Sequence, residues 1–369
     1  MQLYQYALII LWIGAVAVFA RVSPTLKKKV NVLGVEEERF SWWFVLLLLI
    51  PLVLLAAYRT DIGDTFPYRI SFRDAMPDSF DELSDYINSI DKDHGFYVFS
   101  SLIKILLTKN HVIYFGILAA IQLISVFSVF RRYSNNFVLS VSLFVLSSDY
   151  FSWTHNGIRQ FTAVTIIFAF SALIFNKKFF PLILVIIFAS LFHQTALLMI
   201  PVVFFVQGEA WNKRTIILLF LVVLVLVFVG TFTDILDGFL ADTQYKNVVS
   251  DYKEWNDNGT NPFRVAVYSV PAVISFIQRK EIRESGSRLI NICANMSIVT
   301  AAIYIISMVT SGIFIGRLPI YMSLYSYILL PWEIEHFREG SKRRTLYVLM
   351  IILYLVFYYY QMHFAWNVF

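Results

Sequence analysis

The chain has 369 residues, of which 58% are hydrophobic and 15% are charged, and its mean hydropathy is +0.67. Soluble globular domains carry about 25% charged residues, so this composition excludes a soluble protein. Long apolar runs recur over the whole length, which predicts an all-α polytopic integral membrane protein. The formal charge of +5 comes from basic residues in short loops between these runs, which is a topology signal and not a sign of nucleic-acid binding.

About twelve membrane-spanning helices are predicted, and several are shorter than the ~20 residues of a full crossing. In chain order they are Leu3–Ala20, Trp42–Ala57, His111–Phe130, Phe137–Tyr150, Arg159–Phe175, Phe179–Leu191, Gln194–Val206, Ile216–Thr231, Phe263–Gln278, Leu289–Ser311, Arg317–Trp332 and Leu346–Gln361. We expect them to form a single transmembrane domain over residues 1–369. The first run lacks a basic N-terminal region, so we expect a retained helix and not a cleaved signal peptide.

Lysine and arginine set the expected orientation. They follow every second predicted span, beginning with Arg21, Lys27 and Arg39 after the first. Short loops rich in these residues stay on the cytoplasmic side, so both termini are expected outside. The region Phe179–Val206 is either one long tilted helix or two short crossings that meet near His193. Two crossings keep all basic loops inside, and we favour them.

The outer face then receives the long polar segments. The largest is residues 59–110, which is rich in aspartate and serine and contains the amphipathic stretch Phe96–Leu107. Such a stretch is typical of a helix lying on the membrane surface. The second outer loop is residues 233–262, and a short outer loop, Phe151–Ile158, precedes Arg159.

Three outer arginines, Arg59, Arg159 and Arg317, adjoin apolar runs on the side where positive charge is normally scarce. One such arginine is often a side chain that reaches the lipid headgroups. Three on one side, flanked by glycine and polar residues, favour a shared anion site, because guanidinium groups bind phosphate oxygens in bidentate fashion. The natural anion at this surface is the pyrophosphate of a lipid carrier.

Candidate proton acceptors lie near these arginines. His193 interrupts an apolar region, and a histidine there either bonds to a neighbouring helix or binds an anion or relays a proton. Asp64 is a candidate general base, or an aspartate that caps a turn. Gln160, Tyr68 and Tyr321 are candidate substrate contacts. The sequence contains no metal-ligand spacing and no phosphate-binding glycine loop, so neither a metal nor another cofactor is expected.

Four motifs together resemble the signature of EpsG-family proteins, which are Wzy-like bacterial polysaccharide polymerases. In order they are Tyr58-Arg59…Ile62-Gly63-Asp64-Thr65…Tyr68, then Gly157-Ile158-Arg159-Gln160 followed by Ala163, then Phe192-His193-Gln194-Thr195-Ala196-Leu197 running to Pro201, and Arg317…Tyr321. Thr195 stands where the family commonly has serine, and it keeps the hydroxyl.

The resemblance implies a cofactor-independent membrane glycosyltransferase of GT-C-like architecture. It would polymerise undecaprenyl-pyrophosphate-linked oligosaccharide repeat units into a surface polysaccharide at the outer face of the bacterial cytoplasmic membrane. Its partners would be the lipid-linked oligosaccharides and the bilayer, with a chain-length regulator and a flippase as further candidates. As a hypothesis, Arg59, Arg159 and Arg317 hold the donor pyrophosphate, and Asp64 or His193 accepts the proton of the acceptor hydroxyl.

Three alternatives stay open. An O-antigen ligase-like transferase would use the same donor for one transfer and form no ladder of repeats. A lipid-linked oligosaccharide flippase would need charge through the depth of the membrane, whereas the conspicuous charges here lie at the outer rim. A membrane acyltransferase would usually need a histidine–acid pair that faces an acyl donor.

Overall fold

The computed structural model describes residues 4–23, 26–240, 257–337 and 340–368. The chain divides into two compact units, residues 1–198 with 341–369, and residues 199–340. The single transmembrane domain expected over the whole chain stays a prediction. The described residues are helical apart from turns and one β-hairpin, which is the one departure from the all-α expectation within them.

The first unit contains most of the helices. Its elements are α1 (Tyr4–Val22), β1 (Lys27–Val32), β2 (Val35–Phe40), α2 (Trp42–Ala57), α3 (Thr65–Ile70), α4 (Leu83–Asn88), α5 (His94–Leu106), α6 (His111–Tyr133), α7 (Phe137–Leu146), α8 (Asp149–His155), α9 (Ile158–Ala169), α10 (Ser171–Phe175), α11 (Phe179–Ser190) and α20 (Gly340–Tyr360). A 3-10 turn covers Gln194–Leu198, and π-helical turns cover Ser71–Ala75 and Gln361–Ala365.

Helices α1 and α2 are linked by a hydrogen bond that depends on a proline in α2. Pro51 lies inside α2, and a proline has no N–H to give to the carbonyl four residues earlier. That carbonyl belongs to Leu47, and it accepts a hydrogen bond of 2.8 Å from the indole Nε1 of Trp12 in α1. An unsatisfied carbonyl is costly in an apolar environment, so the indole stabilises α2 and holds α1 beside it.

The core of this unit lies among α2, α6, α7 and α9, where α6 packs on each of the other three. Aromatic rings fill it, with the Phe130 centroid 6.0 Å from Phe144 and 5.8 Å from Phe168. Gln122 of α6 is buried and donates to the hydroxyl of Thr162 in α9 at 3.0 Å. This contact fixes the start of α9, which carries Arg159.

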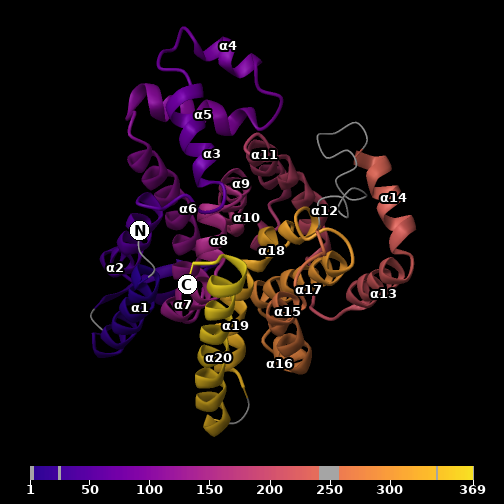
Figure 1. Ribbon diagram of the computed structural model, residues 1–369. Coiled ribbons are helices and arrows are strands. Elements are labelled where there is room, and N and C mark those ends of the chain that lie inside the picture. The colour runs from indigo at the N-terminus through magenta and orange to yellow at the C-terminus, as the bar shows by residue number, and fades with distance from the viewer. Residues whose placement is uncertain (1–3, 24–25, 241–256, 338–339, 369) are drawn as a thin grey trace. The chain divides into compact units, whose positions relative to one another are not determined.

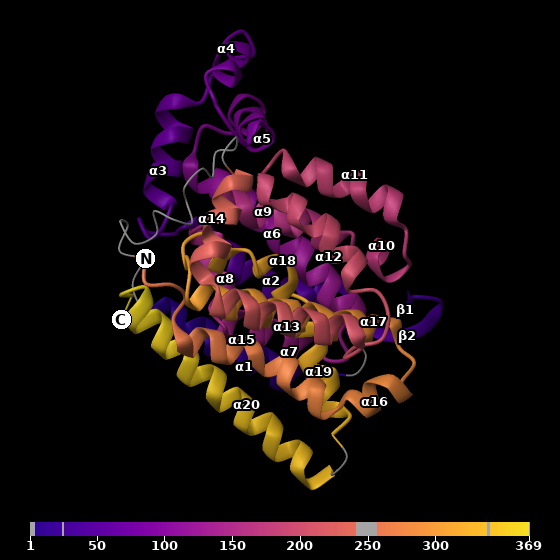
Figure 2. The same ribbon diagram turned by 90° about the vertical axis from the view of Figure 1, so that its right-hand side faces the viewer.

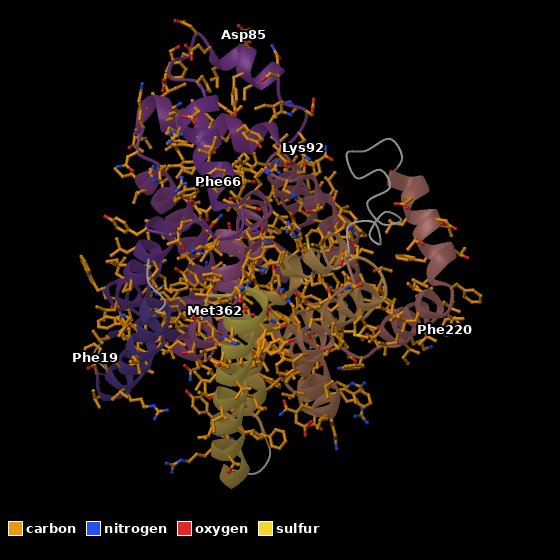
Figure 3. The ribbon with its side chains drawn as sticks, viewed as in Figure 1. Phe19, Phe66, Asp85, Lys92, Phe220 and Met362 are labelled. Carbon is orange, nitrogen blue, oxygen red and sulfur yellow. The ribbon has the colours of Figure 1, made fainter. Side chains whose placement is uncertain are left out.

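Helices α3, α4 and α5 lie together at one end of the unit (Figures 1 and 2). They belong to the predicted outer loop 59–110, and Figure 3 labels Phe66, Asp85 and Lys92 there. The amphipathic stretch is helix α5, as predicted. Its Lys104 is 4% exposed, and the ammonium group donates to the carbonyls of Arg73 and Met76 at 3.1 and 2.5 Å. A position on the membrane surface stays a prediction.

The β1–β2 hairpin lies just before the start of α2 in the chain (Figure 2). Leu33 and Gly34 form its two-residue turn with φ values of 51° and 97°, which suits the right-handed twist of the strands. The hairpin is tied to the end of α6, because the Arg39 Nε donates to the carbonyl of Arg132 at 3.0 Å and the Arg132 Nη2 donates to that of Asn31 at 3.1 Å.

The second unit is built around α17. Its helices are α12 (Met199–Phe205), α13 (Lys213–Val227), α14 (Val229–Leu240), α15 (Pro262–Ile277), α16 (Arg279–Glu284), α17 (Arg288–Met308), α18 (Ile320–Ser323) and α19 (Ser326–Glu335), with a 3-10 turn at Ile315–Arg317. Helix α17 is buried along most of its length and packs on α13, α15, α18 and α19. Residues 241–256 of the predicted outer loop 233–262 lie outside the described residues.

This is a membrane protein. Within the described residues, three helices are long and apolar enough to cross a bilayer, or five spans if two bent helix pairs are each counted as one. Large apolar side chains such as Phe19 on α1 and Phe220 on α13 are exposed (Figure 3), as lipid-facing positions require. The count of twelve spans and the GT-C architecture stay predictions.

Each predicted span contains helix, but several are broken. The chain bends by 62° between α7 and α8 within Phe137–Tyr150 and by 100° between α13 and α14 within Ile216–Thr231, and the region Arg159–Phe175 is divided between α9 and α10. The region Arg317–Trp332 is divided among a 3-10 turn, α18 and α19. In the region Phe179–Val206, α11 ends at Ser190 and the 3-10 turn Gln194–Leu198 packs back on α11. The chain therefore turns near His193, and two separate membrane crossings in this region stay a prediction.

Candidate functional site

An ion pair lies where the outer segment meets α9. The Nη1 of Arg159 is 2.8 Å from the Oδ2 of Asp93, and their side chains are 22% and 2% exposed. The Nε of Arg159 donates to the hydroxyl of Tyr68 at 2.7 Å. The guanidinium carbon lies 6.0 Å from the ring centroid of Tyr68 and 5.7 Å from that of Tyr97. The arginine cation is thus held by a carboxylate and two aromatic rings while part of its surface stays accessible.

The start of α5 explains why Asp93 reaches this position. Asp93 has φ 55°, a left-handed conformation that aspartate tolerates better than most residues. Two residues later, the backbone N–H of Gly95 donates to the carbonyl of Leu191 at 2.9 Å. A Cβ at Gly95 would lie 2.7 Å from the Cβ of Leu191, so this close approach requires glycine. The start of α5 is therefore held against the turn that contains His193.

Asp93 connects Arg159 to that turn. Burial raises the pKa of Asp93, whereas the charge of Arg159 and the backbone N–H of Gln194 act in the opposite direction. The Oδ1 of Asp93 is buried and has no hydrogen-bond partner among the described residues. The carboxylate is therefore costly to bury, and its contacts are with two of the four motifs found in the sequence.

Asp64 joins the first two motifs. Its Oδ2 accepts a hydrogen bond of 2.7 Å from the backbone N–H of Gly157, and its own N–H donates to the carbonyl of His155 at 2.9 Å. With its amide nitrogen turned toward the carboxylate, Asn156 donates to Oδ1 at 2.9 Å. These bonds fix the turn directly before Arg159, so Asp64 positions the arginine.

Arg59 lies in the interior of the unit. It is 8% exposed, and its guanidinium donates to the carbonyls of Ala56 and Thr154. Its charged group also lies 4.5 Å from the ring centroid of Phe115. These contacts connect α2, α6 and α8 beneath the outer segment, which favours a structural role over direct contact with an anion.

His193 is half-buried in the turn that follows α11. Its Nδ1 lies 2.6 Å from the hydroxyl oxygen of Thr195, and this contact orients the imidazole ring. Serine, which the family commonly has at this position, carries the same hydroxyl group. The hydroxyl therefore serves to orient His193. Gln160, the neighbour of Arg159, is 3% exposed.

Arg317 and Tyr321 belong to the second unit. Arg317 ends the 3-10 turn Ile315–Arg317, and Tyr321 is 3% exposed in α18. The loop before this turn is anchored by Asp257, whose Oδ2 accepts from the hydroxyl of Ser311 at 2.7 Å and whose Oδ1 accepts from the N–H of Gly312 at 3.0 Å. Asp257 thus fixes the segment that leads to Arg317.

Sequence reasoning missed Asp93 and Tyr97. The available signal was the run Asp93-His94-Gly95 directly before an amphipathic helix, which indicates a turn but not its partner. Among the described residues, no group of three or more histidine, cysteine, aspartate and glutamate side chains is arranged to hold a metal ion.

Comparison with protein families identifies the chain. The model of the EpsG family matches residues 42–367, which include all four motifs. The chain belongs to the EpsG family. The resemblance inferred from the motifs is confirmed, and the family indicates a glycosyltransferase-type polysaccharide polymerase in general terms. Comparisons with curated proteins and with solved structures give no match.

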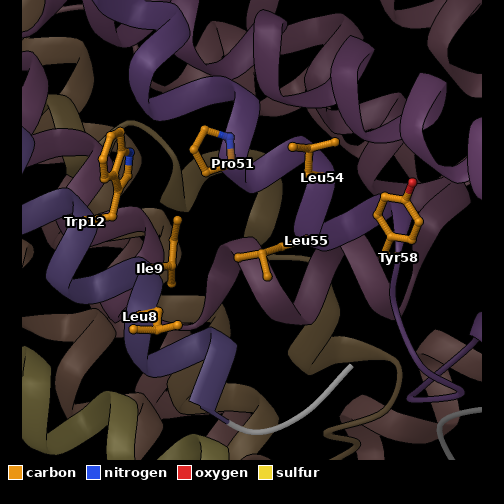
Figure 4. Close-up of a pocket in the computed structure, with 7 residues that line it drawn as sticks. All are labelled: Leu8, Ile9, Trp12, Pro51, Leu54, Leu55 and Tyr58. Carbon is orange, nitrogen blue, oxygen red and sulfur yellow. The ribbon is translucent and has the colours of Figure 1, made fainter.

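The EpsG-family protein also has an apolar groove between α1 and α2 (Figure 4). Its volume is about 440 Å³, and its lining comprises Leu8, Ile9, Trp12, Pro51, Leu54, Leu55 and Tyr58. Tyr58, at one end of the groove, directly precedes Arg59. Such a lining suits a hydrocarbon chain and offers few groups to a polar ligand.

Proposed function

We propose that this protein polymerises undecaprenyl-pyrophosphate-linked oligosaccharide repeat units at the outer face of the cytoplasmic membrane, moving the growing chain onto a new lipid-linked unit. The observation that carries the proposal is the accessible Arg159 cation, oriented by Asp93 and Tyr68 in a member of a polymerase family. A guanidinium held in this way suits a diphosphate leaving group.

In the proposed reaction, the acceptor hydroxyl oxygen attacks the anomeric carbon of the donor. The bond from that carbon to the pyrophosphate oxygen breaks, and the lipid diphosphate leaves with the electron pair. Arg159 stabilises the charge that develops on this leaving group, and Arg317 of the second unit stays a candidate for a further guanidinium. Arg59, which is buried, adds positive potential and braces the segment.

The acceptor proton passes to His193 or Asp64. Geometry favours His193, because the Asp64 Oδ2 already accepts the N–H of Gly157, whereas the ring of His193 is half-buried and oriented by Thr195. An imidazole is also poised to accept a proton near neutral pH. Asp64 then acts by holding the turn before Arg159.

The remaining proposed contacts concern the sugar and the lipid. Tyr68, Gln160 and Tyr321 are 8%, 3% and 3% exposed, so each is proposed to position the groups that contact the donor or acceptor. Burial raises the pKa of Tyr68, so its hydroxyl stays protonated. The apolar groove that ends at Tyr58 (Figure 4) is proposed to hold part of the isoprenoid tail, which would place the attached diphosphate near the outer segment.

The test is complementation of a strain that lacks the gene, with polymer length measured on gels. We expect Arg159→Ala to lower the rate about 100- to 1000-fold, as loss of one charge-stabilising donor does, and to abolish long polymer. Arg69→Ala is the matched control, because Arg69 lies in the same outer segment and pairs with Asp61 at 2.7 Å. Wild-type polymer from Arg159→Ala would overturn its assigned role, and a single transfer product from the wild type would favour the ligase alternative.

A further inference from the structure

A second cavity, of about 340 Å³, lies in the first unit beside the hairpin that precedes α2. The end of α1, the β1–β2 hairpin, the turn between α6 and α7, and α20 enclose it. The hairpin is fixed to the end of α6 by reciprocal hydrogen bonds between the Arg39 and Arg132 regions. The cavity walls are therefore held in place by the fold.

The charges that line this cavity are mostly positive. Arg21, Lys27 and Arg39 contribute three cations against the single carboxylate of Glu38. Arg39 forms an ion pair with Glu37. Lys27 lies 5.8 Å from the ring centroid of Phe40, and neither Lys27 nor Arg21 pairs with a carboxylate in the part of the chain that the structure describes. Two cations are thus available to an anion from solvent or from the membrane.

Neighbouring tryptophans favour a position of the cavity at the level of lipid headgroups. Trp42 and Trp43 follow the hairpin after Ser41 and are 42% and 78% exposed. Exposed indole rings at the end of an apolar helix are typical of the membrane–water interface. On the wall formed by α1, Ala17 and Ala20 precede Arg21, so apolar surface adjoins the basic end of the cavity.

We propose that this cavity binds the headgroup phosphate of an anionic phospholipid. Arg21 and Lys27 contact the phosphate, Arg39 adds a fixed positive charge, and the acyl chains lie along α1. Basic clusters next to membrane helices recognise anionic lipids on the cytoplasmic side, which is the side expected for this hairpin from the distribution of lysine and arginine. The inference does not depend on the polymerase activity.

The experiment uses the purified full chain in neutral detergent. Phosphatidylglycerol is titrated, with phosphatidylcholine as the neutral comparison, and bound lipid is counted by native mass spectrometry while thermal unfolding is followed. We expect Arg21→Gln/Lys27→Gln to weaken phosphatidylglycerol binding about 30-fold, since each surface cation contributes about fivefold. Lys28→Gln/Lys29→Gln is the matched control, because it removes two cations from the same strand outside the cavity.

The wild type and the control should bind phosphatidylglycerol alike, and the cavity variant should lose its preference over phosphatidylcholine. Equal weakening in both double variants would reveal general surface attraction and overturn the site. Protection by inorganic phosphate at the same concentration would assign the cavity to free phosphate and overturn the lipid. If the cavity variant unfolds early in neutral detergent, Lys27→Gln is compared with Lys28→Gln, and the same difference is expected.

Discussion

Asp93 gives the sharpest test of how the site is organised. We predict that Asp93→Asn impairs polymerisation far more than it impairs folding. Removing one partner of a fully buried ion pair costs about 3–5 kcal/mol, because the other charge is left uncompensated. Here Arg159 keeps its hydrogen bond to Tyr68 and its contacts with two aromatic rings, and 22% of its side-chain surface is exposed. The variant also removes a carboxylate that is costly to bury, so we expect a loss of about 1–2 kcal/mol.

The effect on rate should be larger. Without the carboxylate, Arg159 loses the contact that sets its direction and its link to the Gln194 backbone. A displacement of about 1 Å in a charge-stabilising group can cost about 100-fold in rate. We therefore expect Asp93→Asn to lower turnover about 100-fold with a smaller change in KM, and Asp93→Glu to recover part of the loss.

The assay is polymer formation by purified protein from lipid-linked repeat units, with thermal unfolding measured on the same samples. Asp74→Asn is the matched control, because Asp74 pairs with Arg73 at 2.7 Å in the same outer segment and is about half exposed. Turnover within twofold of wild type in Asp93→Asn would refute the reasoning. An equal loss of turnover and folded protein would show that Asp93 acts only in stability.

Three further predictions concern the same region. Gly95→Ala should abolish long polymer in the complementation assay, because its Cβ would lie 2.7 Å from that of Leu191 and push α5 from the turn; normal polymer would contradict this packing. Thr195→Ser should support normal polymer length, whereas Thr195→Val should shorten the polymer. The valine variant should lose about tenfold or more in rate, because His193 is misoriented. Equal activity of both variants would show that the hydroxyl does not orient His193. Burial raises the pKa of Asp93 despite the positive charges of Arg159, Lys92 and His94, so wild-type stability should fall relative to Asp93→Asn as pH rises from about 3.9 through that raised value. Thermal unfolding of both proteins across pH measures this, and a wild type that gains relative stability as pH rises would contradict the direction.

The extent of the apolar helices followed from local chemistry. Helix α2 spans Trp42–Ala57 as predicted, and α6 and α11 begin at the predicted residues His111 and Phe179, because uninterrupted apolar runs in a membrane can only be satisfied by helix. The positions of the breaks inside Phe137–Tyr150, Arg159–Phe175, Ile216–Thr231 and Arg317–Trp332 were not predicted. Pro319 is a local signal for such a break, whereas the tight approach of Gly316 to the Thr260 hydroxyl is a tertiary feature.

The identity of the four motifs, and with it the family, was also determined by the sequence alone. Residue type and order are enough for that, whereas the use of each side chain depends on what lies across from it. Arg59, Asp64 and Arg159 look alike in the sequence, as polar groups beside apolar helices. Only the tertiary structure shows that Arg59 is buried and structural, that Asp64 fixes a turn, and that Arg159 is an accessible cation.

The pairing of Asp93 with Arg159 could come only from the fold. The two residues lie on segments that meet because Gly95 packs against Leu191 and α9 packs against α6, and no local spacing encodes such a meeting. Periodicity and composition act over a few turns of helix and therefore specify the spans. Contacts between distant segments depend on how those spans pack, and this packing determined which charges became partners.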